Sequence, residues 1–503
     1  MIFRCVVMYR KVGSMQDMCI FKNDDSKAAD SFYRKPYFRV RDLLQSENFI
    51  AIVGPRQVGK TVMMIQLANE CGGNYVSFKS LPDNVSDDTF DAVLARIRNN
   101  EKTIEYLDEI TYLEDYGRRL AVLCDAMAVL IAKGQTPQFH VIISGSQQSS
   151  ILDNCSKAFG SRLKVVKIPY ITFGEYLIYK KRLTWNSSFS LIDLTKTITE
   201  EDYIDYLFNS WKFDTSFSTP ANYLMGCIEE TVISEMKESW PSETSVSLDG
   251  RDLQNVLVAI YTILCTLHDN AKIVSYGDYY NLLKKIRMYY NQDHSPNIKV
   301  MDLKGALKST HFYKYVRDGL RKDYFFKILR FLYEMEIIEF VKPMNDTELD
   351  DFFRGFVKEW ATPDDFLMVY NPSFRNAQFF VAVLQEIADE LQVNSFDLLN
   401  NALLGSLVEC TTRSAIHNWL GDNTSKLHSD KNEEVDCIAG NFAIEISVSN
   451  KAGSELHYKA FPEINDHEKI LLTNSVLNLD AEIKRIPYYV FIAHLDLTNR
   501  ILD

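Results

Sequence analysis

An eight-residue glycine motif constrains the fold of this chain more than any other feature. The motif consists of Gly54, Pro55, Arg56, Gln57, Val58, Gly59, Lys60 and Thr61. It follows a continuous apolar run at residues 49–53, and a helical pattern extends from residue 60 to residue 69. A buried strand, a glycine loop and a helix in this order are typical of a phosphate-binding loop in a parallel sheet.

The residue types in this loop suit the binding of phosphate groups. Glycines let the backbone curl so that its N–H groups point at an anion, and the following helix adds its positive end. The ammonium group of Lys60 is expected to reach the phosphates, and the hydroxyl of Thr61 to be a ligand of Mg²⁺. We therefore expect residues 54–61 to bind a nucleotide together with its magnesium ion.

Two carboxylates follow another apolar run, about 50 residues further along the chain. The run at 104–107 ends in Asp108 and Glu109. We expect Asp108 to belong to the magnesium shell, and Glu109 to orient or deprotonate the attacking water. Acidic residues are also favoured at helix N-termini, so the spacing from the glycine motif is what favours this interpretation.

Further groups for the reacting phosphate are predicted at two places. Ser144 or Ser146, at the end of the apolar run 140–143, could contact the γ-phosphate or the water. Fast hydrolysis also requires a charge-neutralising arginine, for which Arg162 is the first candidate and Arg56 the second. The alternative interpretations are an ordinary turn after a strand and an arginine on the surface.

Apolar runs alternate with helical patterns in the first part of the chain, which predicts a parallel α/β sheet. Residues 1–30 carry no periodic signal and are interpreted as an N-terminal extension. Residues 31–199 are predicted to form the P-loop NTPase domain. Residues 200–365 show helical spacing and end in a helix-then-strand pattern at 324–341, which is typical of a winged helix. The remaining residues, 366–503, are predicted to form a third, α/β domain.

The pattern of the last domain predicts one helix followed by several strands. The helix is expected at about 403–419 and the strands at 434–438, 442–448, 469–473 and 488–494.

Composition excludes several classes of protein. The chain has 503 residues, of which 46% are hydrophobic and 24% charged, and this excludes wholesale disorder and low-complexity classes. Its nine cysteines are scattered without a CxxC pair, which indicates a reduced, cytoplasmic protein without disulfides or a zinc site. No uncharged apolar stretch reaches about 18 residues, so we expect no membrane span.

A basic stretch stands out against the net charge of −13. Residues 284–330 contain twelve lysines and arginines but only four aspartates, with aromatic residues between them. Lysines and arginines that neutralise phosphates are expected on a DNA-binding face, so this stretch is a candidate for contact with DNA. A solvated helical face, or a surface that meets acidic parts of the same protein, is the alternative.

Four segments together resemble a widespread prokaryotic family. They read GPRQVGKT, YLDEI, IISGS and GSRLKVVKIPYITFGEYL. The family comprises AAA-superfamily ATPases related to signal-transducing (STAND) NTPases, with a winged-helix region and a C-terminal restriction-endonuclease-like domain. The resemblance covers residues 31–503 and implies Mg²⁺-dependent hydrolysis of ATP. The chain departs from the family at Thr111, where a glutamine usually follows the DEI sequence.

The resemblance also implies a metal site in the last domain. Glu409, Asp436 and Glu445 resemble the carboxylates with which restriction endonucleases hold Mg²⁺. Ser447 occupies the position of the lysine that helps to activate water, and serine cannot supply its charge. Lys451, in the following turn, is a speculative replacement. A nuclease domain that has lost its activity and serves as a binding module fits this pattern better than an active one.

Three functions therefore compete. The first is an ATPase in which Lys60, Thr61 and Asp108 hold ATP and Mg²⁺, and in which hydrolysis switches the later domains. The second is a nucleotide-gated DNA-binding or scaffold protein with little hydrolysis, and the third is an ATP-gated, metal-dependent nuclease. Glu109 favours the first over the second, and Ser447 argues against the third. The oligomeric state stays open, because an arginine from a neighbouring copy would require a dimer or a ring.

Overall fold

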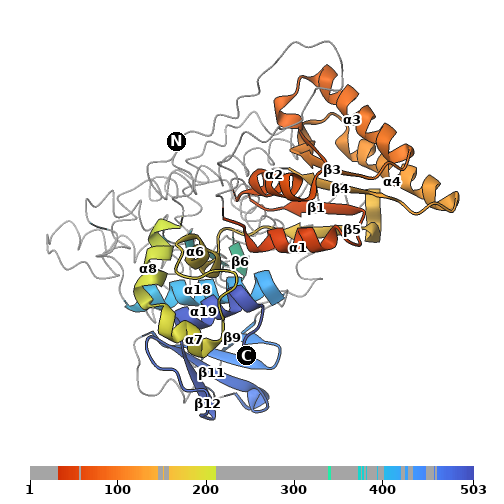
Figure 1. Cartoon of the computed structure of the whole chain (residues 1–503). Coiled ribbons are helices and arrows are strands. Elements are labelled where there is room, and N and C mark those ends of the chain that lie inside the picture. The colour runs from red at the N-terminus through yellow and green to blue at the C-terminus, as the bar shows by residue number, and fades with distance from the viewer. Residues whose placement is uncertain are drawn as a thin grey trace, which may run out of the picture. The chain divides into compact units, whose positions relative to one another are not determined.

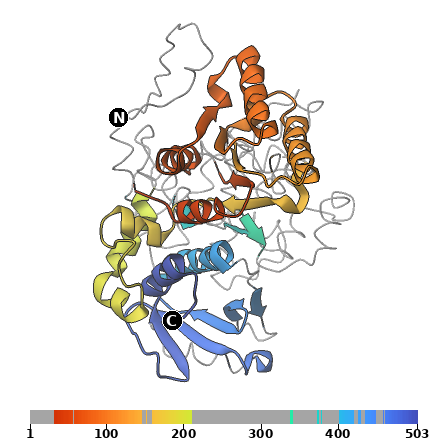
Figure 2. The ribbon, with the colours of Figure 1, turned by 45° about the vertical axis from the view of Figure 1, so that its right-hand side comes forward.

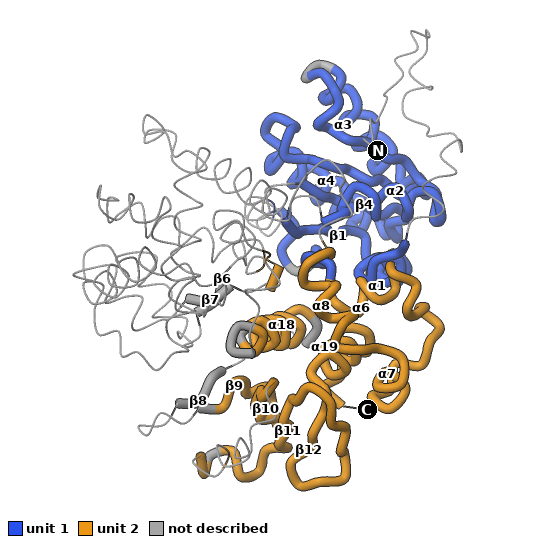
Figure 3. The backbone as a smooth tube through the Cα atoms, turned by 90° about the vertical axis from the view of Figure 1, so that its left-hand side faces the viewer, with its two compact units in different colours: residues 1–171 blue, residues 172–503 orange. Residues whose placement is uncertain are grey.

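The computed structural model describes two compact units, Met1–Ile171 and Thr172–Asp503 (Figures 1 and 3). The residues that it describes are 32–55, 58–145, 151, 158–210, 338–340, 372–374, 377–378, 381, 394, 401–420, 425–428, 434–448, 458 and 461–502. Several predictions therefore fall outside the described residues. These concern the extension 1–30, the basic stretch 284–330, most of the winged-helix pattern, and the residues Arg56, Gln57, Ser146 and Lys451.

Unit 1 contains a five-stranded parallel sheet. Its elements are α1 (Lys35–Leu43), β1 (Phe49–Val53), α2 (Lys60–Cys71), β2 (Asn74–Ser77), α3 (Asp83–Arg98), β3 (Thr103–Asp108), α4 (Tyr116–Ala132), β4 (Phe139–Ser144) and β5 (Leu163–Lys167). The strand order is β2-β3-β4-β1-β5, and every neighbouring pair is parallel. The predicted parallel α/β sheet is confirmed, and β4 lies between the strand that precedes the glycine motif and the strand that ends in Asp108.

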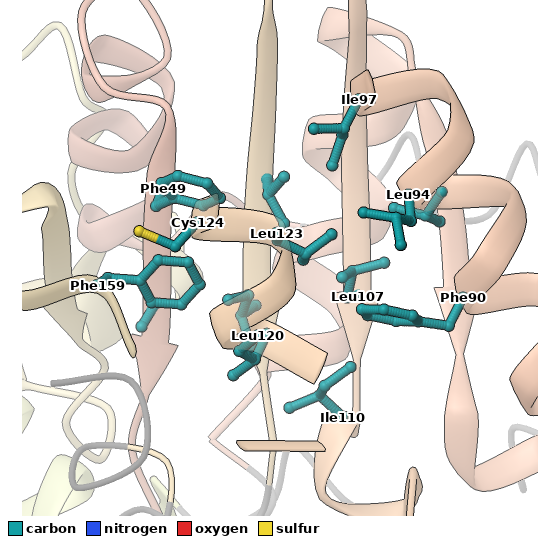
Figure 4. Packing of buried hydrophobic residues seen from close by; sticks show 14 of the residues in the cluster. Phe49, Phe90, Leu94, Ile97, Leu107, Ile110, Leu120, Leu123, Cys124 and Phe159 are labelled. Atoms are coloured by element: carbon teal, nitrogen blue, oxygen red, sulfur yellow. The ribbon is translucent and has the colours of Figure 1, made fainter. Parts of the chain in front are cut away.

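The sheet is buried on both faces, as the continuous apolar run of β1 predicts. All five residues of β1 are buried, and alternate side chains point to opposite faces. Phe49 faces α3 and α4, in a cluster with Cys124 and Phe159 (Figure 4). The ring centroids of Phe49 and Phe159 are 4.4 Å apart. On the other face, α2 packs against β3 and α1 against β5.

Unit 2 contains a second five-stranded sheet, in the order β12-β11-β10-β9-β8. Its elements are α6 (Phe173–Tyr179), α7 (Leu191–Thr197), α8 (Glu200–Asn209), β6 (Ile338–Phe340), β7 (Pro372–Phe374), α18 (Asn401–Leu420), β8 (Ser425–His428), β9 (Glu434–Ala439), β10 (Phe442–Ile446), β11 (Glu468–Thr473), β12 (Ile483–Pro487) and α19 (Tyr488–Thr498). Strands β8, β9 and β10 are antiparallel neighbours, whereas β10, β11 and β12 are parallel.

The helices that follow the first sheet pack against the last part of the chain (Figures 1 and 2). The ring of Tyr203, in α8, lies 5.3 Å from the ring of Tyr488, in α19, and its hydroxyl lies 2.8 Å from Thr411 Oγ1 in α18. The hydroxyl of Tyr488 donates to Glu200 Oε1 at 2.6 Å. Residues 172–210 therefore belong with residues 401–502, and the boundary between the compact units lies at 171/172. The domain boundary at residue 199 stays a prediction.

One predicted strand is a helix. The run at 488–494 was expected to be a strand, but it forms the first part of α19, and the strand before it, β12, ends at Pro487. Eight of its residues from Val490 onward are buried in succession, so α19 is buried on all sides. A continuous apolar run does not distinguish a buried helix from a buried strand, which explains the error.

Within the winged-helix pattern, only β6 is described, and it pairs with β7 in an antiparallel fashion. Among the described residues, no helix is both long and apolar enough to cross a membrane.

Gly174 tests the packing of α6 on α19. Its N–H donates to Asp496 Oδ2 at 3.0 Å, and a Cβ atom at this position would lie 2.8 Å from Asp496 Cβ. We expect Gly174→Ala to lower the free energy of unfolding of unit 2 by about 1–3 kcal/mol, because the added methyl group overpacks the contact. Chemical denaturation followed by circular dichroism measures this change.

Gly405→Ala is the matched control. A Cβ atom there would lie 3.6 Å from Val448 Cγ2, an ordinary contact, and alanine favours a helix over glycine. Equal stability of both variants would contradict the close packing of α6 on α19.

Candidate functional site

The carboxyl ends of β1, β3 and β4 bring the predicted residues of the first site together. Asp108 ends β3, Ser144 ends β4, and the glycine motif follows β1. The carboxyl ends of parallel strands share one edge of the sheet, where ligands of open α/β folds bind.

Asp108 is the centre of this edge. Its side chain is buried, and the hydroxyl of Thr61 donates to Oδ2 at 2.7 Å. The hydroxyl of Ser144, which is also buried, donates to Oδ1. Hydrogen bonds from three hydroxyls in all compensate for the removal of a charged carboxylate from water.

The third hydroxyl is that of Tyr75, which sequence reasoning missed. Tyr75 lies in β2, next to β3, and its hydroxyl donates to Asp108 Oδ2 at 2.8 Å. In the sequence, Tyr75 begins an apolar run and reads as an ordinary core residue. No signal in the sequence indicates that its phenol faces a carboxylate 33 residues away.

The glycine motif is held closely at Gly54 and at Lys60. Gly54 has φ +156°, and a Cβ atom there would lie 2.3 Å from the carbonyl oxygen of Ile168. Only glycine permits this approach of the loop to the segment after β5.

Lys60 is the first residue of α2. Its ammonium group donates to the carbonyl oxygens of Gly54 at 2.8 Å and Pro55 at 2.7 Å.

Glu109 follows Asp108 in a strained conformation. Its φ of 52° and ψ of 44° are left-handed, which glutamate seldom adopts. The turn ends β3 at Asp108 and leads directly into a short helical turn that starts at Ile110. Left-handed backbone at a non-glycine residue costs about 1–3 kcal/mol. Among the described residues Asp115 and Lys181 share this conformation, so it is the place of Glu109 directly after Asp108 that connects it with the site.

These residues fit a nucleotide with its magnesium ion. Thr61 and Asp108 supply two oxygen atoms 2.7 Å apart, and Mg²⁺ prefers oxygen ligands. The N-terminus of α2, a helix of 12 residues, and the ammonium of Lys60 provide positive charge beside them. The arrangement can therefore hold the phosphates and the ion at one edge of the sheet.

Arg162 is not brought to this edge. It precedes β5, whose first residue, Leu163, is the partner of Phe49 at the amino end of β1. The length of β1 separates that end from the glycine motif, about 16 Å at 3.3 Å per residue. The guanidinium of Arg162 instead donates to Cys124 Sγ at 3.0 Å. Arg162 therefore does not lie where it could neutralise charge in the phosphate site of its own copy.

The carboxylates predicted in unit 2 do not form a metal site. Glu409 pairs with Arg413, one turn further along α18, and both side chains are buried. Asp436 Oδ2 accepts the backbone N–H of Ile446 at 2.8 Å. Within the part of the chain that the structure describes, no three His, Cys, Asp or Glu side chains could together hold a metal ion.

A buried tyrosine lies near two of these carboxylates. Burial and the neighbouring charge of Glu445 raise the pKa of Tyr458 well above its usual value. Its phenol therefore stays protonated and donates to the carbonyl oxygen of Ile470, which fixes it within the sheet of unit 2.

Comparisons with known proteins agree with the first site. A family model described as an AAA domain matches residues 46–177. Together with the parallel sheet and the cluster around Asp108, this match defines an AAA-type P-loop ATPase domain that binds nucleotide. No curated protein matches the chain.

Two solved structures are similar to the chain at low identity. A Walker-type ATPase of Pyrococcus abyssi is 12% identical, with a TM-score of 0.37, and the match covers 71% of this chain and 96% of that one. A DNA replication initiation factor is 16% identical, with a TM-score of 0.26, and the match covers 59% of this chain and 99% of that one. TM-scores this low carry no argument about function.

Tyr75→Phe tests the hydrogen bond that the sequence did not reveal. Loss of the phenol leaves Asp108, which is buried, with one donor fewer, and a hydrogen bond to a charged group contributes about 1.5–3 kcal/mol. We expect the free energy of unfolding of unit 1 to fall by about that amount in the absence of nucleotide. Urea denaturation provides the measurement.

Tyr106→Phe serves as the matched control. Tyr106 is a buried tyrosine of β3 whose hydroxyl has no hydrogen-bond partner among the described residues. Removal of an unsatisfied hydroxyl is expected to be neutral or stabilising. If both variants lose the same stability, the bond from Tyr75 to Asp108 contributes nothing specific.

Proposed function

We propose that this chain is a Mg²⁺-dependent ATPase, in which binding and hydrolysis of ATP switch its later domains between two states. The observation that carries the proposal is the cluster of Thr61, Asp108 and Ser144, with Lys60 beside it, at the carboxyl edge of a parallel sheet. ATP, rather than another nucleotide, follows from the resemblance to AAA-superfamily ATPases.

Each residue of the edge has a role in this proposal. Residues 54–61 surround the phosphates with backbone N–H groups, and Lys60 exchanges its carbonyl partners for phosphate oxygens. Thr61 and Asp108 hold the magnesium ion, which supplies charge stabilisation on the phosphate oxygens when it is bound. Ser144 keeps Asp108 in place from the neighbouring strand and lies where it can contact the attacking water.

Glu109 is the proposed general base. The left-handed turn places it directly after Asp108 at the same edge. As water attacks the γ-phosphorus and ADP leaves, its carboxylate accepts the proton of the water. The charge-neutralising arginine is then Arg56 or an arginine of a second copy, and the latter would require self-association.

The domains after the ATPase domain are the parts whose state ATP would change. We propose a winged-helix region within 200–365, contact with DNA through 284–330, and a restriction-endonuclease-like fold for the last domain. The ion pair of Glu409 with Arg413 and the bond from the Ile446 N–H to Asp436 support a structural role for these carboxylates. The last domain would then act as a binding module rather than as a nuclease.

Cysteines outside disulfides support a reducing compartment such as the cytoplasm. Among the described cysteines, Cys71, Cys124, Cys410 and Cys437 are in no disulfide. Disulfides are rare in such a compartment, and buried thiols there act as small apolar residues.

Steady-state hydrolysis of ATP with Mg²⁺ tests the proposal. We expect Glu109→Gln to lower turnover by at least about 100-fold while the Kd for ATP changes little, because the amide cannot accept the proton. Lys60→Ala should abolish binding. Glu114→Gln, at an exposed position near α4, is the matched control and should hydrolyse ATP normally.

Two outcomes would contradict the assignment. Full turnover in Glu109→Gln would remove Glu109 from the role of base. Wild-type protein that binds ATP but does not hydrolyse it would favour the nucleotide-gated DNA-binding or scaffold protein.

The same assay with duplex DNA tests the role of residues 284–330. Turnover that rises with DNA, and less so at high salt, would support contact with phosphates through this stretch. Turnover that is indifferent to DNA would direct attention to protein partners.

A further inference from the structure

Arg34 connects two segments of unit 1 that are far apart in the sequence. Its Nη1 donates to the carbonyl oxygen of Val58, within the glycine motif, at 2.8 Å, and to that of Pro169 at 2.9 Å. Its Nη2 donates to the carbonyl oxygen of Tyr170 at 3.3 Å. A planar guanidinium has several donors in a fixed arrangement, and this suits one side chain that holds three carbonyls.

Arg34 is itself held in place. It is the residue before α1, and its carbonyl oxygen accepts the N–H of Tyr37 at 3.0 Å. Tyr37 and Val40 are buried, and they fix α1 against the sheet. The backbone from which the Arg34 side chain extends is therefore fixed by packing of α1, and the guanidinium is held by its three carbonyl partners.

The bond to Val58 fixes the direction of the next amide. A trans peptide is planar, so the carbonyl of Val58 and the N–H of Gly59 point in opposite directions. The described residues contain no cis peptide bond. Since Arg34 holds the carbonyl on its own side, the N–H of Gly59 points away from Arg34.

Gly59 is the cap residue of α2. Its φ is +90°, and its carbonyl oxygen accepts the N–H of Met63 at 2.9 Å, which starts the helix. Its N–H therefore belongs to the group of donors at the N-terminus of α2 that has no partner within the helix. An alternation of right-handed and left-handed residues, which aims successive N–H groups inward, is how backbone binds an anion.

The other two carbonyls belong to the segment that leaves unit 1. Pro169 and Tyr170 directly precede the boundary between the units at 171/172. The N–H of Ile168 donates to the carbonyl oxygen of Val53 at 2.7 Å, and Gly54 packs closely on Ile168. The glycine motif and this exit segment are therefore joined both by direct contact and through Arg34.

We propose that Arg34 is a positioning residue for the phosphate-binding loop. It orients the Gly59 N–H toward the α- and β-phosphates of the nucleotide and couples the loop to residues 168–171. The inference rests on the proposed binding of nucleotide. A residue that only supports the fold would alter stability, whereas a positioning residue alters affinity for phosphates in the folded protein.

Affinities for ADP and ATP, each with Mg²⁺, test the proposal by isothermal titration calorimetry. We expect Arg34→Ala to weaken both nucleotides by the same factor, about 10- to 100-fold, because both carry the phosphates that the Gly59 amide faces. Arg39→Ala, at an exposed arginine of the adjoining helix α1, is the matched control and should bind like wild type.

A conservative variant covers the case in which Arg34→Ala does not fold. Lysine keeps the charge but cannot span carbonyls of both segments, so Arg34→Lys should bind about three- to tenfold more weakly than wild type. Hydrogen exchange adds a second readout: nucleotide should protect residues 168–171 in wild type and in Arg39→Ala, and less so in either Arg34 variant.

The outcomes separate this inference from the proposed function. If wild type binds neither nucleotide, the proposed function fails. If wild type binds both, and a folded Arg34 variant binds both within twofold of Arg39→Ala with unchanged exchange at 168–171, the role of Arg34 is overturned. Weaker binding of ATP alone would also overturn it, because Arg34 would then act on the γ-phosphate and not on the phosphates that ADP and ATP share.

Discussion

A single carboxylate, that of Asp108, joins four elements of unit 1. Asp108 is the last residue of β3. Its carboxylate accepts hydrogen bonds from the hydroxyls of Thr61 in α2, Tyr75 in β2 and Ser144 in β4. A buried charge is costly unless it is compensated, and these three donors supply the compensation. The hydroxyl of Thr61 has a second use, because a magnesium ion would compete with Asp108 for it. The hydrogen bond from Thr61 to Asp108, which stabilises this edge of the sheet, would therefore have to break when Mg²⁺ and nucleotide bind.

The strand order determines which residues can take part in this arrangement. With β4 between β1 and β3, the hydroxyl at its carboxyl end lies between the glycine motif and Asp108. The same register places Arg162 at the other end of the sheet. Packing fixes this geometry, since β1 is buried on both faces and a shift by one residue would exchange every side chain between them.

The local sequence pattern was sufficient to predict the strands of unit 1, but it did not predict every side-chain contact between them. The run 49–53 predicts β1 with its observed bounds, and the motif with its two carboxylates predicts the edge at Asp108, because these signals lie in adjacent residues. Tyr75 and Arg34 escaped because neither belongs to a motif, and in the sequence nothing distinguishes the tyrosine from a core residue or the arginine from a surface residue; their partners lie 33 and up to 136 residues away. The run 488–494 was misassigned as a strand because burial on all sides removes periodicity. Glu409, Asp436 and Glu445 follow a family pattern, but among the described residues no three such side chains could together hold a metal ion.

The pairing of α6–α8 with α18 and α19 has a consequence for how the chain is made. The aromatic faces of Phe173, Tyr203 and Tyr206 are buried against one another and against Tyr488 of the last helix. A ribosome adds about 5–20 residues per second, so tens of seconds pass between the synthesis of α8 and the synthesis of α19, which covers these aromatic rings. During that interval the sheet of unit 1 can already be complete, whereas α6–α8 expose apolar surface. The order of synthesis therefore makes unit 2 the slower part to mature.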